Sequence, residues 1–281
     1  MIYVGCSGFQ YADWRGRFYP ENLQPKEYLG YYTNFFNTVE IDSSYYSFPG
    51  KKTVQAWIER LKDRKDFRMS LKFPKEVSHD PDGITEKSIQ SAEEFVSEVI
   101  FPLRDNGIMG AGLIQLSPFL NPVKDGGVID SLMRLLDGLP TSEFNLAIEI
   151  RNSAFLVDRI FHDLTSGLKM RKVAICSVDS PGLPPFYEST ASFSYLRFHG
   201  QNRDLWFGSG ELNGRLNKYD YLYEEQELIP WVERVKEMTQ DIYIYFNNHA
   251  QAKAPKNATQ FSKLLGLRRD NSDKQKSLTE F

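Results

Sequence analysis

Short apolar runs recur along the chain and are separated by segments with a different periodicity. The runs are rich in Val, Ile, Phe and Tyr, which are enriched in β-strands. Eight of them lie at residues 2–6, 38–42, 67–73, 112–116, 145–151, 172–179, 193–199 and 242–247. Helical patterns lie between most of these runs, and strands that alternate with helices predict a parallel sheet.

Seven other segments carry apolar residues at the three- and four-residue spacing of a helix. They lie at residues 25–36, 53–61, 89–103, 128–139, 154–164, 219–238 and 250–265. Pro255 opposes a helix that starts at residue 250, so we expect the last helix to begin near Ala254. Residues 180–191 contain three prolines and are too short for a full helix, which predicts an irregular, helix-poor crossover between the sixth and seventh strands.

Eight strands favour closure of the sheet into a (β/α)8 barrel of the TIM type, and an open doubly wound sheet is the alternative. A barrel of this kind needs about 250 residues, and the chain has 281. We therefore expect a single domain over residues 1–267. Residues 268–281 are polar, and we expect them to form a mobile tail.

Polar residues alternate with apolar ones in several of the predicted strands, which is unusual for a parallel sheet. Arg68, Ser70 and Lys72 share one parity in the third strand, and Glu149 and Arg151 share one parity in the fifth. Successive side chains of a strand point to opposite faces, and a charge pressed beneath a helix is costly. The polar parity should therefore face the lumen, near the C-terminal mouth where the chemistry of TIM barrels is located.

Two carboxylates and a histidine of this parity are candidates for acid–base catalysis. A carboxylate in a low-dielectric lumen can have a raised pKa, which suits Glu40 and Glu149 to general acid and base roles. His199 is a candidate for proton transfer because imidazole titrates near neutral pH. The alternatives are that Arg151 or Arg197 clamps each carboxylate in its ionised form, and that hydrogen bonds hold His199 structurally.

Three basic residues predict a site for an anion. Lys72, Arg151 and Arg197 would meet at the mouth, and the planar guanidinium of arginine matches carboxylate and phosphate groups. The other polar residues that we expect to contact the ligand are His79, Gln115, Asp179, Asn247 and Asn248. The alternative role for the two asparagines is to cap the last helix.

Aromatic side chains near the predicted mouth could form a stacking rim. The candidates are Phe9, Tyr45, Tyr46 and Trp206, whereas Trp14 is better explained as a core residue.

A divalent metal is the alternative to an anion site. Glu40, Glu149, Asp179 and His199 could act as ligands, as Glu, Asp and His do in endonuclease-IV-like and xylose-isomerase-like barrels. However, the chain has only four histidines and contains no HxH or HExxH spacing. The basic residues of the same parity would also repel a cation. We therefore expect no cofactor and keep the metal as the alternative.

Seven short motifs follow one another along nearly the whole chain. They are Cys6-Ser7-Gly8-Phe9 with Trp14, Val39-Glu40-Ile41-Asp42, Lys72 with His79, Gln115-Leu116-Ser117-Pro118, Glu149-Ile150-Arg151, Leu196-Arg197-Phe198-His199-Gly200 and Phe246-Asn247-Asn248. In this order they resemble the DUF72 (YecE-like) family, and the resemblance implies a TIM barrel but no established activity. Asp42, Ser117 and His249 stand where the family pattern has Asn, Pro and an acidic residue.

The charge and composition of the chain bear on which partners and which cellular compartment we expect. The net charge is −3 and the pI is about 5.9, so the chain lacks the basic excess of a non-specific nucleic-acid binder. Its two cysteines indicate no disulfide framework, which suits a reducing cytoplasm. We recognise no signal peptide and no apolar stretch that would span a membrane, so we expect a cytoplasmic protein. Nothing in the pattern indicates the oligomeric state.

These observations favour an enzyme, of hydrolase, lyase or isomerase type, that binds a small anionic or phosphorylated molecule at the C-terminal mouth of the barrel. One alternative is a metal-dependent phosphoesterase or nucleic-acid-processing barrel. The other is a non-catalytic protein that captures a ligand in the same cavity.

Overall fold

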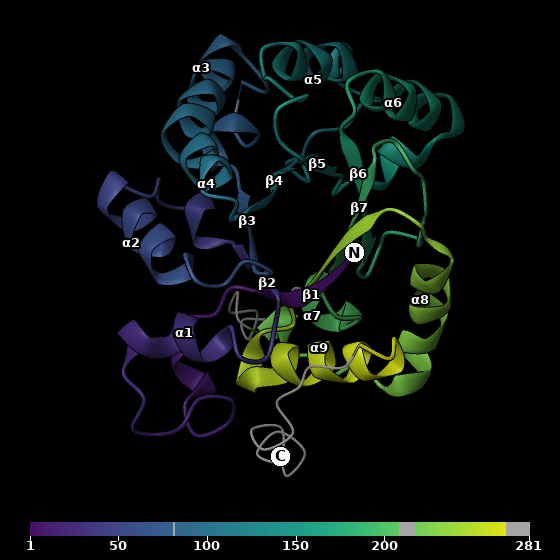
Figure 1. Ribbon diagram of the computed structural model, residues 1–281. Helices are drawn as coiled ribbons and strands as arrows, with labels where there is room; N and C mark the ends of the chain where they lie inside the picture. Colours follow the sequence, from purple (N-terminus) through teal and green to yellow (C-terminus); the bar gives the residue numbers. More distant parts are fainter. Residues whose placement is uncertain (81, 208–216, 268–281) are drawn as a thin grey trace.

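Eight parallel strands close into a barrel in the computed structural model, which describes residues 1–80, 82–207 and 217–267 (Figure 1). Each strand pairs with the next along the chain, and β8 returns to β1. The strands are β1 Ile2–Ser7, β2 Thr38–Ile41, β3 Arg68–Lys72, β4 Met109–Gln115, β5 Leu146–Glu149, β6 Ala174–Asp179, β7 Phe193–Phe198 and β8 Asp241–Phe246. The predicted (β/α)8 barrel is confirmed, and the open doubly wound sheet is wrong.

Helices surround the barrel and cover its outer face (Figure 1). They are α1 Tyr28–Tyr32, α2 Lys51–Leu61, α3 Glu86–Phe95, α4 Phe101–Asp105, α5 Val128–Asp137, α6 Asp158–Met170, α7 Arg203–Phe207, α8 Glu225–Glu237 and α9 Lys253–Leu264. A π-helical turn, Val96–Ile100, joins α3 to α4. Pro102 follows this turn and has no backbone N–H to continue the α-helical ladder.

Several helices differ in extent from the prediction, and the segment predicted as 25–36 is α-helical only over Tyr28–Tyr32. The segment predicted as 219–238 is helical only from Glu225, because Glu224 and Glu227 form a reciprocal capping box that starts α8 there. The segment predicted as 154–164 becomes a 3-10 turn, Ser153–Leu156, followed by α6 from Asp158.

Two other local predictions are confirmed. The crossover at 180–191 contains no helix, and β7 follows it directly. The last helix begins at Lys253, one residue before the predicted start, after Gln251 and Ala252 adopt left-handed conformations with φ of 55° and 61°. The predicted polar tail, 268–281, lies outside the described residues.

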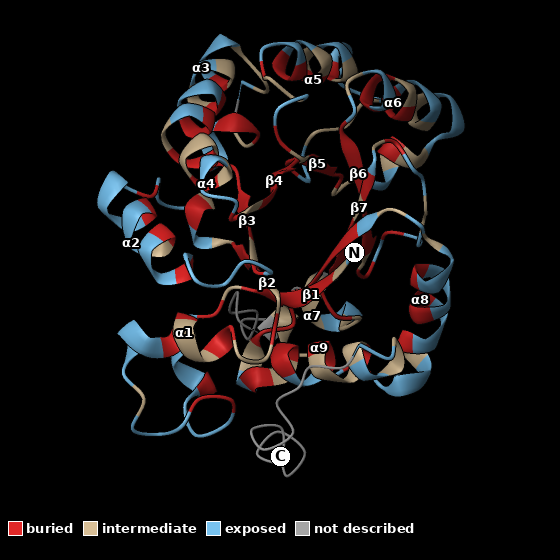
Figure 2. Cartoon of the chain, viewed as in Figure 1, coloured by how far each residue is buried: buried red, intermediate tan, exposed pale blue. Residues whose placement is uncertain are grey.

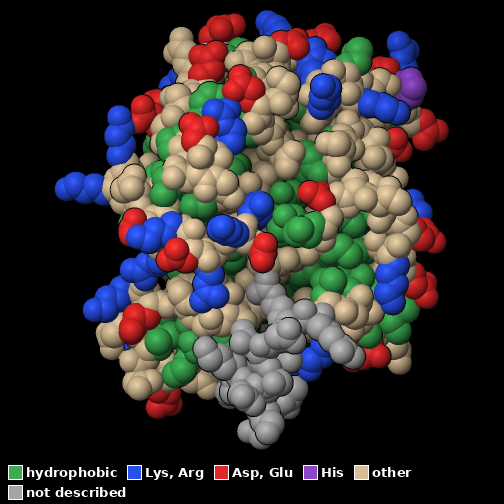
Figure 3. Space-filling model, viewed as in Figure 1, with side chains coloured by type: hydrophobic (Ala, Val, Ile, Leu, Met, Phe, Trp, Pro, Cys, Tyr) green, Lys and Arg blue, Asp and Glu red, His purple; other side chains and the backbone are tan. Residues whose placement is uncertain are grey.

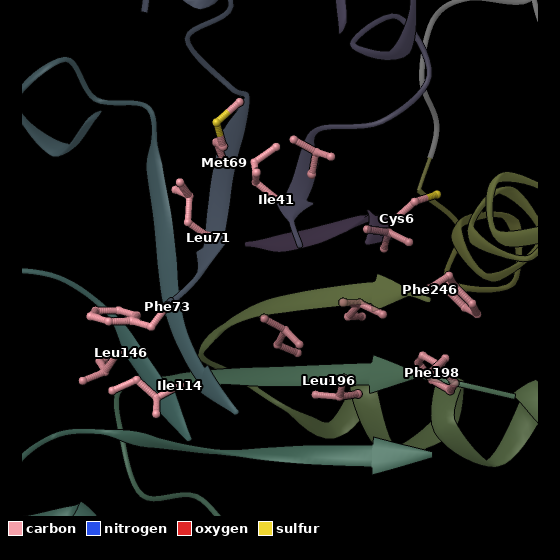
Figure 4. Close-up of a cluster of buried hydrophobic side chains, with 14 of the residues drawn as sticks. Cys6, Ile41, Met69, Leu71, Phe73, Ile114, Leu146, Leu196, Phe198 and Phe246 are labelled. Carbon is pink, nitrogen blue, oxygen red and sulfur yellow. The ribbon is translucent and has the colours of Figure 1, made fainter. Parts of the chain in front are cut away.

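The strands are almost entirely buried (Figure 2), and their alternate residues belong to two separate buried clusters. The outward-facing residues pack beneath the helices, and Figure 4 shows part of this cluster, including Leu71, Ile114 and Phe198. The inward-facing residues fill the lumen with Ala, Val, Leu and several tyrosines. Tyr3 and Tyr243 stack in this filling with ring centroids 4.8 Å apart. The lumen is therefore packed below its polar upper part.

The outer surface is mixed in charge. On the face that Figure 3 shows, Lys and Arg side chains are interspersed with Asp and Glu side chains. Within the described ranges, no helix has both the length and the apolar character needed to cross a membrane.

Candidate functional site

Arg197 lies at the centre of the upper lumen and joins three strands that are distant in sequence. It points inward near the end of β7 and is 1% exposed. Its Nη1 donates to Glu149 Oε2 on β5 at 2.5 Å, and its Nη2 donates to Glu40 Oε1 on β2 at 2.7 Å. Both carboxylates are completely buried. The guanidinium is therefore the common partner of two buried negative charges. Burying these two carboxylates without a cation would cost free energy of folding.

The carboxylate oxygens of this cluster have further partners. Glu40 Oε2 accepts from Tyr195 Oη at 2.6 Å, and Glu40 Oε1 accepts from Ser7 Oγ at 2.5 Å. Glu149 Oε1 accepts from Gln115 Nε2 at 2.7 Å. Every oxygen of both groups is thus engaged within the protein.

The surroundings of Glu149 favour its ionised form. Burial by itself raises the pKa of the Glu149 carboxyl, but the guanidiniums of Arg197 and Arg151 bring that pKa well below its usual range. The clamped alternative that the sequence left open therefore describes Glu149, and the raised pKa needed for a general acid is wrong for it. Neither Glu40 nor Glu149 lines the cavity described below.

His199 is a buried, neutral member of the same network. Its Nδ1 lies 3.0 Å from the amide Nδ2 of Asn247, and its Nε2 lies 3.3 Å from Glu149 Oε1. Because the amide nitrogen can only donate, Nδ1 accepts and the proton belongs on Nε2. Burial, with help from the Arg151 charge, lowers the pKa of His199 to about 3. The structural alternative thus fits His199 better than a proton shuttle near neutral pH.

A cavity of about 790 Å³ opens above this network, at the C-terminal ends of the strands. This volume lies within the range of small-molecule sites. Four of the charged side chains that line it are basic and one is acidic. They are Lys72, Arg151, Arg197, Lys218 and Asp42.

Lys72 and Asp42 form an ion pair in the cavity wall. Lys72 Nζ lies 3.5 Å from Asp42 Oδ1 and 3.8 Å from the centre of the Tyr45 ring. Burial lowers the pKa of Lys72. Burial also tends to raise the pKa of Asp42, but Lys72 and Arg197 make it lower than usual. Asp42 was missed as a site residue, although it shares the inward parity of Glu40 and lies one step nearer the mouth.

Arg151 presents hydrogen-bond donors to the cavity. Its guanidinium lies 5.2 Å from the centre of the Trp206 ring, and its Nη1 lies 3.1 Å from Glu149 Oε1. This buried nitrogen has no hydrogen bond of acceptable geometry within the described residues. A planar cation held by a ring and a carboxylate is well placed to receive a second anion.

Three more predicted ligand residues line the cavity, namely His79, Gln115 and Asn247. Burial and the nearby Lys72 charge lower the pKa of His79 to about 4, so its imidazole is neutral near pH 7. Gln115 and Asn247 also bond to the network beneath the cavity. They therefore connect the cavity floor to the buried ion pairs.

Asp179 does not belong to the cavity, which corrects the prediction. In β6 the residues that face the lumen are Cys176 and Val178, so Asp179 points outward beneath α8. Its carboxylate accepts from Tyr223 Oη at 2.5 Å and from Trp231 Nε1 at 3.2 Å. Burial raises its pKa despite these bonds. Tyrosine and tryptophan donors make this outward polar position tolerable.

Asn248 was also expected at the ligand and lies elsewhere. Its Nδ2 donates to the Tyr221 carbonyl and to Asn257 Oδ1, both at 2.8 Å. These bonds hold the loop before α8 against α9. Its role is therefore structural, although it bonds to the interior of α9 and does not cap it.

Aromatic side chains contribute much of the cavity wall. Of the predicted rim, Phe9, Tyr45 and Tyr46 line the cavity, and Trp206 stacks beside Arg151. Trp14 is fully buried, as expected of a core residue. The sequence did not identify the further ring residues Tyr11, Phe119, Tyr219 and His249. They lie outside the strands, where no strand periodicity marks their direction.

The alternative metal set does not fit this arrangement. Asp179 faces away from the lumen, and the oxygens of Glu40 and Glu149 already bind Arg197 and neutral donors. In the part of the chain that the structure describes, no group of three His, Cys, Asp or Glu side chains is arranged to hold a metal ion. We therefore assign no metal ligands here.

Comparisons with known proteins agree with this architecture. The family model described as "Protein of unknown function DUF72" matches residues 3–280. The UPF0759 protein YunF of Bacillus subtilis is 23% identical over 95% of both chains, and UPF0759 protein YecE of Escherichia coli is 27% identical over 73% of this chain and 78% of its own.

Two crystal structures of DUF72 family proteins have the same fold. The protein from Thermotoga maritima has a TM-score of 0.77 at 29% identity, covering 95% of this chain and 99% of its own. The protein from Enterococcus faecalis has a TM-score of 0.81 at 22% identity, covering 96% and 97%.

Proposed function

This chain belongs to the DUF72 family, whose function is unknown, and we propose that it is an enzyme that binds a small carboxylate or phosphate compound in the mouth cavity. One observation carries the proposal. The charged side chains that line the cavity are four bases and one acid, whereas the whole chain has a net charge of −3. Positive charge is thus concentrated where a ligand would enter.

Arg151 is the main anion-binding residue in this proposal. Arg197 is already committed to Glu40 and Glu149, and Lys72 is paired with Asp42. Arg151 also has an ion-pair partner, Glu149, at 3.1 Å, but its Nη1 forms no well-formed hydrogen bond in the described structure, and the residue lines the cavity. A carboxylate or phosphate group in the cavity would pair with the part of the guanidinium that lines it, and the Trp206 ring would keep the guanidinium plane in place.

The acid–base work belongs to Lys72 and Asp42 in this proposal. They line the cavity, whereas Glu40 and Glu149 lie beneath it. A lysine with a lowered pKa next to a carboxylate gives up its proton to a ligand more readily than an ordinary lysine does. Hydrolase, lyase and isomerase reactions all use such a step.

Replacing Arg151 with methionine should weaken anion binding while preserving most of the packing against Trp206. We expect calorimetric titration with inorganic phosphate, pyruvate and citrate to show binding of at least one anion. A charge-assisted hydrogen bond contributes about 1.5–3 kcal/mol, so Arg151→Met should lower that affinity by about ten- to a hundredfold.

The matched control is Arg104→Met on α4, where the guanidinium pairs with Asp105 and Glu143 away from the cavity. It should bind the anion as the wild type does. Absence of binding for all three anions, or equal affinity in the Arg151 variant, would contradict the proposal.

A non-catalytic binding protein is the second candidate, because the two carboxylates first considered for catalysis are committed to Arg197. The two candidate functions predict different results for a substitution of Asp42. If the cavity is catalytic, Asp42→Asn removes proton transfer and leaves anion binding largely intact. If it only captures a ligand, no chemical change of a bound ligand is ever detected in either protein.

A further inference from the structure

We propose that Lys72 is a nucleophile whose amine forms an imine with an aldehyde or ketone group of the ligand. The ligand class is then a small molecule with both a carbonyl and an anionic group. This inference rests on the proposed function for the cavity and for the anion, and it adds the covalent step. It follows from the position, burial and neighbours of one amine.

The position of Lys72 is set firmly by the fold. It is the last residue of β3 and shares the inward parity of Arg68 and Ser70. Its backbone carbonyl accepts a hydrogen bond from Ser44 Oγ at 2.6 Å, which ties the strand end to the 3-10 turn Ser43–Tyr45. The ring of Tyr45, from that turn, lies against the amine. The side chain thus emerges into the cavity from a rigid part of the barrel.

The burial of Lys72 sets it apart from the other lysines that the structure describes. It alone among them is buried, with 7% of its side chain exposed, yet it lines the cavity. Lys218 also lines the cavity, but it is half-buried and lies over the rings of Trp206 and Tyr219. A buried amine that still faces a cavity meets the requirement for an amine nucleophile, which must be accessible and partly unprotonated.

The neighbours of the amine act in opposite directions on its charge. Burial lowers the pKa of Lys72, and the charges of Arg197 and Arg151 act in the same direction. Asp42 and the face of the Tyr45 ring favour the ammonium. Asp42 is the only ion-pair partner of Lys72 in the described structure, at 3.5 Å, and the charge of Glu149 acts in the same direction as Asp42. The net result is a lysine that loses its proton more readily than usual.

The reaction needs no group beyond Lys72, Asp42 and the ligand. The Asp42 carboxylate accepts a proton from the Lys72 ammonium, and the freed nitrogen lone pair attacks the carbonyl carbon. A C–N bond forms, and the C=O π electrons move to oxygen, which takes up the proton. A second nitrogen proton passes through Asp42 to the hydroxyl, the C–O bond breaks, and water leaves. Ammonium plus carbonyl thus give a protonated imine plus water, with no change in oxidation state.

Arg151 would orient such a ligand. Its cationic side chain lines the same cavity, close enough for its charge to affect the pKa of Lys72. An anionic group bound by Arg151 would hold the carbonyl carbon near the amine, which raises the effective concentration of the two reacting groups. This arrangement favours an anionic carbonyl compound over a neutral aldehyde of similar size.

The imine can be trapped by reduction. The full chain is incubated with sodium cyanoborohydride and either glyoxylate or pyruvate, which carry a carboxylate, or acetaldehyde or propanal, which do not. Intact-mass spectrometry measures the reduced adduct, and peptide mapping finds the modified lysine. We expect a single adduct at Lys72 with at least one carboxylate compound, formed faster than with the matching neutral aldehyde.

Two variants complete the test. Lys72→Arg keeps a positive charge but cannot form the imine, so the Lys72 adduct should be lost. Lys62→Met removes an exposed lysine that pairs with Glu59 and should leave the adduct unchanged. Because the wild-type peptide map alone locates the adduct, the result stands even if the Lys72 variant folds poorly. Adducts spread evenly over exposed lysines would overturn the inference.

The outcomes also separate this inference from the proposed function. Phosphate or citrate binding that depends on Arg151, with no Lys72 adduct from any of the four carbonyl compounds, would overturn the imine and support the anion site. A Lys72 adduct that forms equally well with neutral and anionic compounds, in a protein that binds none of the tested anions, would support the nucleophile and overturn the anion site.

Discussion

Replacing Arg197 with methionine is expected to lower the free energy of unfolding by about 3–5 kcal/mol, because the change leaves two buried carboxylates without their shared cation. Glu40 and Glu149 are fully buried, and each accepts a short hydrogen bond from this guanidinium. Urea unfolding followed by circular dichroism measures the loss. This is the largest effect that we expect from a single substitution.

A pH series tests the cause of that loss. In the Arg197→Met variant, only Arg151 and His199 still oppose the effect of burial on the pKa of Glu149, so this carboxyl should protonate more readily. The stability deficit relative to the wild type should therefore shrink in mildly acidic buffer. Arg104→Met, which affects a surface ion pair, serves as the control and should change stability little. Equal stability of the two variants would show that the central ion pairs do not hold the barrel together.

The second large effect concerns acid. The pKa of His199 is about 3 in the folded protein and 6.5 in its ordinary state, so the unfolded chain binds more protons between these values. Stability must therefore fall as the pH decreases below 6.5. One such group contributes about 1.4 kcal/mol per pH unit, which amounts to about 2–3 kcal/mol between pH 6.5 and 4.5.

His199→Gln removes this titration and keeps an amide that can bond to Glu149 and Asn247. The variant should lose less stability than the wild type over that pH window, whatever its stability at pH 8. His162→Gln, at an exposed position on α6, should follow the wild-type curve. Parallel curves for the His199 variant and the wild type would exclude a buried neutral imidazole. Below pH 4.5 the lowered pKa of Glu149 adds a loss of the same sign in all three proteins.

The fold could be predicted because a (β/α)8 barrel requires eight short apolar strands that alternate with helical segments, and this alternation is visible in the sequence. Parity along the strands also placed Glu40, Glu149 and Arg197 correctly in the lumen. The prediction that Asp179 faces the lumen was wrong, because it assumed that a polar side chain on a strand never lies beneath the helices. Tyr223 and Trp231 supply hydrogen bonds there from 44 and 52 positions along the chain, and no local pattern shows them.

Depth within the lumen could not be predicted either. Glu40 and Asp42 share one face of the same segment, yet Glu40 is completely buried and Asp42 lines the cavity. The difference depends on how far neighbouring strands are staggered and on which of their side chains, such as Tyr195, reach across. Those relations belong to the closed barrel and have no counterpart in the linear sequence.

The tyrosine-filled lower lumen has a kinetic consequence. Tyr3, Tyr195, Tyr243 and Tyr245 lie together beneath the ion pairs, with Tyr195 and Tyr245 at a centroid separation of 5.2 Å. A molecule bound in the mouth cavity therefore has packed side chains below it in the lumen. It must leave through the same opening by which it entered. If the cavity is catalytic, as we propose, product and substrate would compete for this opening, so inhibition by the product should be competitive.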